Sequence, residues 1–262
     1  MIQYLFEFDD WIVGATIVCL YLISALLLSA IALWSPFRTR MNIIGCATQD
    51  LLFFLGVLFS LSIGFLAVEI EDRIQKAASA LSVEGNSLRG IASILKVEGP
   101  EATNVRAAAR GYLENSIKRE LSGSRTTIEF STASQKMEEL GAAAAALTEA
   151  NAVSGPVRNM ILELALRASD ARARRIGLMS AEPNELKWAL LLYLLFSIQV
   201  ALVLIHGADT RRMVVHLLLI SLAGSLSIAA AALTEDPFTQ PRMVSIAPLE
   251  AALEALSKID RR

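Results

Sequence analysis

The chain alternates between long apolar stretches and strongly charged ones. A bilayer requires about 20 residues of apolar helix, and four runs have this character: Trp11–Trp34, Leu51–Val68, Trp188–Ile205 and Met213–Leu233. Two short connections, Ser35–Asp50 and His206–Arg212, join the first pair of runs and the last pair. The pattern therefore predicts two membrane-spanning hairpins.

The segment between the hairpins, Glu69–Lys187, carries equal numbers of acidic and basic residues and cannot lie in a bilayer. No Gly or Pro separates Val68 from Ala80, so we expect the second span to continue into this segment as one helix. An apolar stripe at three-, four- and seven-residue steps supports that helix: Ile74, Ala78, Leu81, Leu88, Ile91 and Leu95. Further helices are predicted at Glu101–Leu121, Ser134–Ala150 and Val157–Ile176.

The predicted fold class is all-α, because no stretch has a convincing two-residue alternation. We expect four parts: a first transmembrane hairpin (1–68), a charged helical extramembrane domain (69–187), a second transmembrane hairpin (188–233), and a C-terminal turn with an amphipathic helix (234–262).

Composition agrees with a membrane protein that has a sizeable water-exposed part. Hydrophobic residues make up 54% and charged residues 19% of the chain, and the mean hydropathy is +0.50. A formal net charge of −2 without a basic block does not indicate nucleic-acid binding. Cys19 and Cys46 suggest neither a disulfide framework nor a thiolate metal site. The arginines near the span ends leave the membrane orientation open.

Candidate catalytic chemistry is sparse. His206 and His216 lie ten residues apart around the turn of the second hairpin. A metal-binding or general-base role is one alternative, but an active site needs a constellation of groups, and interfacial polar residues are the favoured interpretation. Phosphate-loop and hydrolase motifs are absent from the sequence. We therefore expect no enzyme activity, no cofactor and no metal site.

The spans contain no Lys, Arg, Asp or Glu in their cores, unlike most ion-coupled transporters. In the fourth span, the small residues Ser221 and Ser225 favour close helix packing. In the second span, Phe53, Val57, Leu61 and Phe65 lie four residues apart and form one stripe. Such a stripe is usually a packing surface. Around an axis formed by several copies, it would instead make a hydrophobic constriction that gates by dewetting.

Several motifs resemble those of the bestrophin-like membrane proteins. After the second span, EDRIQKAASALSVEGNSL matches the family's post-span pattern at Asp72, Arg73, Ala77, Glu84 and Asn86. The stretch RAAARGYLENSIKREL is similar to the family's next helix, with Tyr112 and Glu120 in place. Beyond the last span, the family's turn is matched by Asp236, Pro237 and Phe238, and then by Val244, Pro248 and Leu249.

This resemblance implies a pentameric channel for small anions such as chloride, with the second span lining the axis. It places Phe53, Val57 and Leu61 at the hydrophobic neck. It also implies a multi-pass protein of the bacterial inner membrane, with the helical domain and both termini in the cytoplasm. Calcium gating is not expected, because no carboxylate lies between Asp236 and Glu250. The alternative function is a non-conducting membrane scaffold whose helical domain recruits a partner protein.

Overall fold

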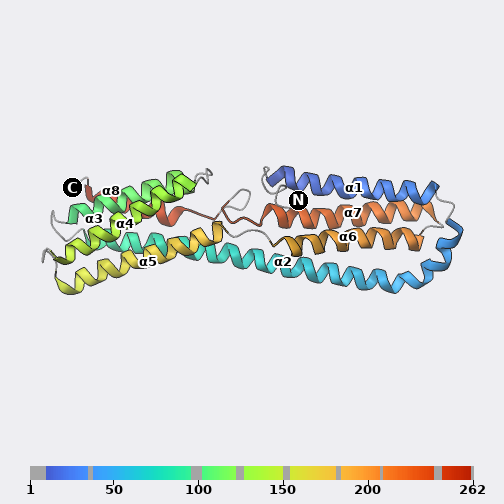
Figure 1. Cartoon of the computed structure of the whole chain (residues 1–262), viewed down its shortest axis with the longest axis horizontal. Coiled ribbons are helices and arrows are strands. Elements are labelled where there is room, and N and C mark those ends of the chain that lie inside the picture. Colours follow the sequence, from blue (N-terminus) through green and yellow to red (C-terminus); the bar gives the residue numbers. More distant parts are fainter. Residues whose placement is uncertain are drawn as a thin grey trace. The chain divides into compact units, whose positions relative to one another are not determined.

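The structure, a computed structural model, describes residues 10–34, 38–95, 102–121, 127–149, 154–180, 184–206, 209–238 and 244–260. For 38–49 and a few helix ends it describes the backbone alone. Throughout these ranges every regular element is a helix (Figure 1). The predicted all-α fold class is confirmed.

The helices follow one another along the chain as α1 (Asp10–Trp34), α2 (Arg38–Ile94), α3 (Thr103–Asn115), a π-helical turn η3 (Ser116–Glu120), α4 (Thr127–Glu149), α5 (Gly155–Met179), α6 (Glu185–His206), α7 (Thr210–Leu233) and α8 (Ala247–Asp260). They belong to two compact units. We call residues 1–72 and 182–236 the membrane unit, and residues 73–181 and 237–262 the charged unit. The four-part domain division remains a prediction.

The membrane unit contains all four predicted spans, since α1, α6, α7 and the first half of α2 are long and apolar enough to cross a bilayer. Within it, α7 lies against α1 and α6 (Figure 1). This close packing depends on small residues of α7: Ser221 and Ser225 are fully buried, and a Cβ at Gly224 would overlap the side chain of Leu195. The packing role predicted for Ser221 and Ser225 is confirmed.

A buried amide holds the three helices α1, α6 and α7 together. Gln199 on α6 is fully buried and donates to the Ser221 hydroxyl of α7 at 2.7 Å and to the Tyr21 carbonyl of α1 at 3.0 Å. Its own amide oxygen accepts from the Ser24 hydroxyl at 2.7 Å. Inside an apolar unit, a side-chain amide satisfied on both its atoms fixes the rotation of each helix relative to the others.

Helix α2 is continuous for 57 residues, from Arg38 to Ile94. This confirms that the second span runs into the charged segment without a break. Most of the connection between the first two spans is helical as well, because α2 already begins at Arg38. Once a helix is nucleated, each added residue contributes another hydrogen bond, and no proline lies between Arg38 and Ile94 to stop it.

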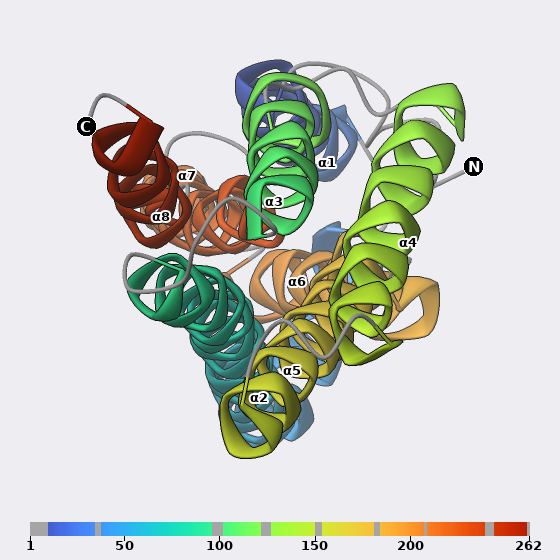
Figure 2. The same ribbon diagram turned by 90° about the vertical axis from the view of Figure 1, so that its left-hand side faces the viewer.

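The charged unit has its own apolar core. α3 lies against α4 and α8, and α4 against α5 (Figure 2). The predicted stripe supplies part of this core through Leu81, Leu88 and Ile91 of α2 and through Leu95 directly after it, all with 0% exposure. One predicted member is wrong: Ala78 is exposed and its neighbour Ala77 is buried, because both alanines satisfy the spacing and only packing separates them.

Two helix bounds also differ from the expectation. α4 begins at Thr127 rather than near Ser134, and no Gly or Pro lies between these positions to delay it. The predicted helix Glu101–Leu121 begins at Thr103 and changes to π geometry at Ser116. α2 ends at Ile94, and Gly99 and Pro100, which favour a helix end in the sequence, lie outside the described residues.

The C-terminal segment docks onto the charged unit through a close approach of two backbones. A Cβ built on Gly85 of α2 would lie 2.5 Å from the backbone carbonyl of Pro248 at the start of α8. Leu249, Ala252 and Leu256 of α8 are buried in the same core. Glycine at position 85 is therefore required sterically, because any other side chain meets a backbone that cannot rotate away.

We expect Gln199→Leu to lower the stability of the membrane unit by about 1 kcal/mol, the usual size of a hydrogen bond between transmembrane helices. Ser197→Ala on the same helix is the matched control, because the Ser197 hydroxyl is exposed and bonds only within its own helix. Thermal unfolding of the purified variants in detergent tests this. Equal midpoints for the two variants would contradict it.

We expect Gly85→Ala to destabilise the charged unit by about 1–3 kcal/mol, the usual cost of overpacking. The control is Gly141→Ala in α4, where no atom lies within 4 Å of the added Cβ. There the better helix propensity of alanine should stabilise by up to about 1 kcal/mol. Gly85→Ala should lower the unfolding midpoint and speed proteolysis at α8. Gly141→Ala should raise the midpoint and should not speed that proteolysis. A stabilising Gly85→Ala would show that α8 does not dock as described.

Candidate functional site

The apolar segment of α2 is barely covered by the rest of its chain. Only 6% of its most apolar 18-residue window is buried, against 28% for α1, 50% for α6 and 39% for α7. The other three spans therefore pack on one another, whereas the second span leaves most of its surface for something outside the chain. In a membrane, that can be lipid or another copy of the protein.

This segment has an inner and an outer face. Leu52, Leu55 and Phe59 pack against the core formed by α1, α6 and α7. The outer face carries the predicted stripe, with Phe53 76%, Val57 49%, Leu61 52% and Phe65 66% exposed. All four candidate neck residues thus lie on the outer face, in one row along the helix.

Small residues run beside this stripe. Gly56, Ser60 and Gly64 lie four residues apart, and a Cβ at either glycine would have no neighbour within 4 Å. Together with Val57, Leu61, Phe65 and Val68, Ser60 and Gly64 line a shallow open groove along the helix. Rows of small residues on an uncovered span are typical of surfaces that another transmembrane helix approaches closely.

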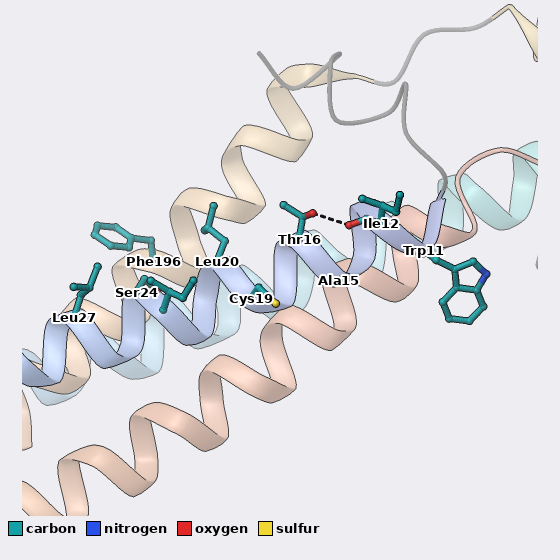
Figure 3. A pocket seen from close by; sticks show the side chains of 10 residues that line it. Trp11, Ile12, Ala15, Thr16, Cys19, Leu20, Ser24, Leu27 and Phe196 are labelled. Carbon is teal, nitrogen blue, oxygen red and sulfur yellow. Dashed lines mark hydrogen bonds between the residues drawn. The ribbon is translucent and has the colours of Figure 1, made fainter.

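A second open groove follows the outside of α1 (Figure 3). Its lining is apolar apart from Thr16, Cys19 and Ser24, and the Thr16 hydroxyl is already committed to the Ile12 carbonyl at 2.7 Å. Trp11 points outward at one end of the helix (Figure 3). This surface has the chemistry of a lipid-facing wall rather than that of a catalytic pocket.

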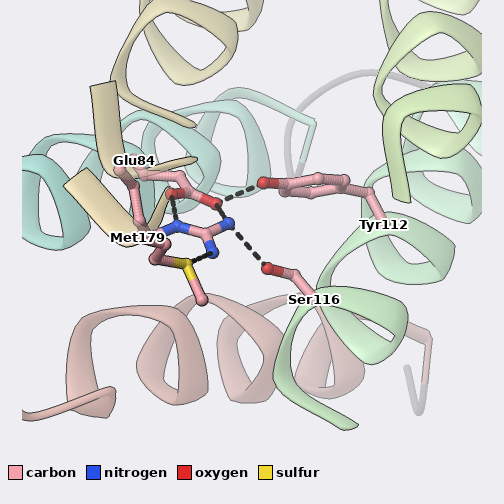
Figure 4. A network of polar contacts seen from close by, with 5 residues as sticks. Glu84, Tyr112, Ser116 and Met179 are labelled. Atoms are coloured by element: carbon pink, nitrogen blue, oxygen red, sulfur yellow. Dashed lines mark hydrogen bonds and ion pairs between the residues drawn. The ribbon is translucent and has the colours of Figure 1, made fainter. Parts of the chain in front are cut away.

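In the charged unit, the motif residue Glu84 is the centre of a fully buried polar network (Figure 4). Arg175 of α5 donates two hydrogen bonds to the Glu84 carboxylate, from Nε at 2.8 Å and from Nη2 at 3.1 Å. The Tyr112 hydroxyl of α3 donates to the same carboxylate. Arg175 also donates to the Ser116 hydroxyl at 3.0 Å. Two-pronged guanidinium–carboxylate pairs of this kind combine strength with fixed geometry.

Sequence reasoning singles out Glu84 and Tyr112 but misses Arg175, which lies among several basic residues near the end of α5. The spacing of 91 residues between Glu84 and Arg175 gives no local signal. Ser116 was also missed. It begins the π-helical turn η3, and short π-helical turns are frequent at functional sites.

The remaining motif positions are dispersed. In α2, Asp72 is exposed, Arg73 is half-buried, and exposed Asn86 donates to the Ser82 hydroxyl at 3.2 Å. At the last turn, Asp236 is half-buried, whereas Pro237 and Phe238 are buried. The Pro237 carbonyl accepts from the Val244 amide at 2.8 Å. Asp236, Pro237 and Phe238 follow the end of α7 at Leu233, and the Pro237 contact ties this turn to the start of the C-terminal segment.

The structure brings the two histidines together. The Nδ1 of His216 lies 3.3 Å from the Nε2 of His206, with the rings edge to face and 4.7 Å apart. Among the described residues, no group of three or more His, Cys, Asp or Glu side chains is arranged to hold a metal ion.

Similar folds occur among solved membrane proteins. A crystal structure described as that of a membrane protein superposes with a TM-score of 0.75 and 15% identity, covering 94% of this chain and 99% of that chain. A bestrophin homologue from Klebsiella pneumoniae carrying a point mutation gives a TM-score of 0.74, 15% identity, and coverage of 94% and 99%. Another crystal structure of the Klebsiella pneumoniae homologue gives 0.73, 13% identity, and coverage of 95% and 98%. The chain has no significant match among curated protein sequences.

The fold and the uncovered apolar helix define an all-α integral membrane protein with four spanning helices. Residues 18–249 match the model of the Bestrophin-like domain. Because this match covers most of the chain, the protein belongs to the bestrophin-like family, as its motifs indicated.

We expect Arg175→Met to destabilise the charged unit by about 3–5 kcal/mol, because it leaves the Glu84 carboxylate buried without its counter-ion. Arg167→Met is the matched control on the same helix: the Arg167–Glu163 pair is exposed, and such pairs contribute less than about 1 kcal/mol. The double variant Glu84→Gln/Arg175→Met should recover part of the loss. Unfolding of the three variants in detergent measures this, and an equal effect of Arg175→Met and Arg167→Met would refute it.

Proposed function

We propose that the protein is a homo-oligomeric channel that conducts small anions such as chloride passively, through an axis lined by the outer face of α2. The observation that carries this proposal is the 6% burial of the apolar segment of α2 within its own chain. Membership of the bestrophin-like family supports it, because the resemblance in sequence implies the same assembly and the same lining helix.

Assembly around α2 gives its two uncovered rows separate tasks. Gly56, Ser60 and Gly64 allow the α2 helix of a neighbouring copy to come close, since no side chain holds it off. The adjacent row of Phe53, Val57, Leu61 and Phe65 then faces the axis. The family resemblance suggests five copies in the ring.

The chemistry of this axis fits passive conduction. Phe53, Val57, Leu61 and Phe65 offer no hydrogen bonds to water, so a narrow ring of them resists wetting and sets the main barrier. The spans hold no Lys, Arg, Asp or Glu in their cores that would couple transport to ion charge. A channel, rather than an enzyme or a coupled carrier, is the function that these residues serve best.

We further propose the bacterial inner membrane as the location, with the charged unit and both termini in the cytoplasm. The four-part division at residues 68, 187 and 233 then separates two membrane hairpins from the cytoplasmic segments. Calcium does not enter this proposal, because Asp236 is half-buried at the end of α7 and no carboxylate follows it before Glu250.

The test is chloride efflux from liposomes containing the purified protein. We expect Val57→Ala and Leu61→Ala to raise the efflux rate, because smaller side chains widen the constriction and ease its wetting. A barrier lowered by about 1 kcal/mol corresponds to about a fivefold increase. The matched control is Leu219→Ala, which removes an equally exposed leucine from a different span, α7.

The oligomer must be verified intact in each preparation. If intact wild-type oligomers pass no chloride and neither α2 variant opens them, the channel proposal fails. The scaffold alternative then predicts a specific co-purifying protein whose binding requires residues 69–187. If Leu219→Ala changes efflux as much as Val57→Ala does, α2 does not line the path.

A further inference from the structure

The histidine pair at the α6–α7 hairpin remains without a role in conduction. His206 ends α6, and His216 lies in the second turn of α7, so the turn of the hairpin brings two imidazoles from different helices together. His206 is half-buried and His216 is exposed. Both rings therefore lie at the surface of the membrane unit, where an ion can reach them from water.

The distance between the two facing imidazole nitrogens matches the distance between two nitrogen ligands of one zinc ion. Zinc binds imidazole nitrogen at about 2.0–2.1 Å in tetrahedral geometry, which places two ligand nitrogens about 3.3–3.4 Å apart. The Nδ1 of His216 and the Nε2 of His206 are 3.3 Å apart. The same distance also permits a direct N–H···N hydrogen bond between the two rings when no ion is bound.

The other nitrogen of His206 sets its tautomer. Nδ1 lies 3.4 Å from the Leu202 carbonyl, and a carbonyl oxygen can only accept, so the proton of the neutral ring belongs on Nδ1. The lone pair of Nε2 is then directed at His216. A backbone carbonyl that holds the second nitrogen of a histidine in this way is the usual support of a metal-binding imidazole.

His216 can meet the same requirement. With its proton on Nε2, its Nδ1 lone pair lies 3.3 Å from the Nε2 of His206. Two lone pairs at this distance repel each other unless a cation or a proton lies between them. The nearby Arg212 is paired with Asp209 at 3.1 Å, which offsets part of its charge.

We propose that His206 and His216 form a two-imidazole binding site for a late first-row divalent ion such as Zn²⁺, with water completing its coordination. Imidazole suits Zn²⁺, Cu²⁺ and Ni²⁺ and does not suit Mg²⁺ or Ca²⁺. A bound ion cross-links the end of α6 to the second turn of α7 and so fixes the hairpin at the membrane surface. This site does not depend on whether the protein conducts anions.

Calorimetric titration of the full-length protein with ZnCl₂ tests the proposal. The protein is purified in detergent without a histidine tag, and Cys19→Ser and Cys46→Ser remove the competing thiols. We expect one Zn²⁺ per chain, unaffected by excess Mg²⁺. His216→Ala and His206→Ala should each weaken binding by about tenfold or more, since even the supporting partners of a ligand are worth that much.

Thermal unfolding provides a second measurement. Zn²⁺ should raise the unfolding midpoint of the protein that keeps both histidines, because a ligand that binds only the folded state stabilises it. It should leave the unfolding midpoints of both histidine variants unchanged. Arg211→Ala is the matched control on the same turn and should keep both the binding and the midpoint shift. Absence of binding, or binding that survives His216→Ala, would overturn the site.

Discussion

The constraint on which the charged unit depends is the burial of one carboxylate. Glu84 lies on α2 with no exposure to solvent, and its charge is balanced by Arg175 from α5 and hydrogen-bonded by Tyr112 from α3. A buried charge is tolerated only with a well-placed counter-ion and satisfied hydrogen bonds. The contacts therefore fix the rotation of these three helices about their own axes. Gly85, beside Glu84, lets α8 approach closely.

In the membrane unit, a neutral buried side chain plays the part that the buried carboxylate plays in the charged unit. Gln199 satisfies its amide on α1 and α7, so it fixes three spans without the cost of a charge in hydrocarbon. Small residues of α7 complete the packing. These contacts pack α1, α6 and α7 on one another, and they leave most of the apolar segment of α2 uncovered. The uncovered row of small residues and the stripe beside it are what an assembly around α2 needs.

Much of the candidate site could be predicted from the sequence. The stripe from Phe53 to Phe65 and its continuation into a charged helix follow from local spacing, because side chains four residues apart share a helix face. The motif residues Glu84 and Tyr112 were recognisable by resemblance. The partner Arg175 was not, since 91 residues separate it from Glu84, and a cluster of arginines near a helix end looks the same whether it is solvated or buried.

The sequence by itself determined the all-α class, the four spans and the continuity of α2, because helix periodicity and the absence of breakers are local properties. Only the tertiary structure decided that Ala77 rather than Ala78 enters the core, that the stripe of α2 is left uncovered by its own chain, and that His206 meets His216. Each of these depends on which helix lies beside which, and contacts between distant segments leave no periodic trace along the chain.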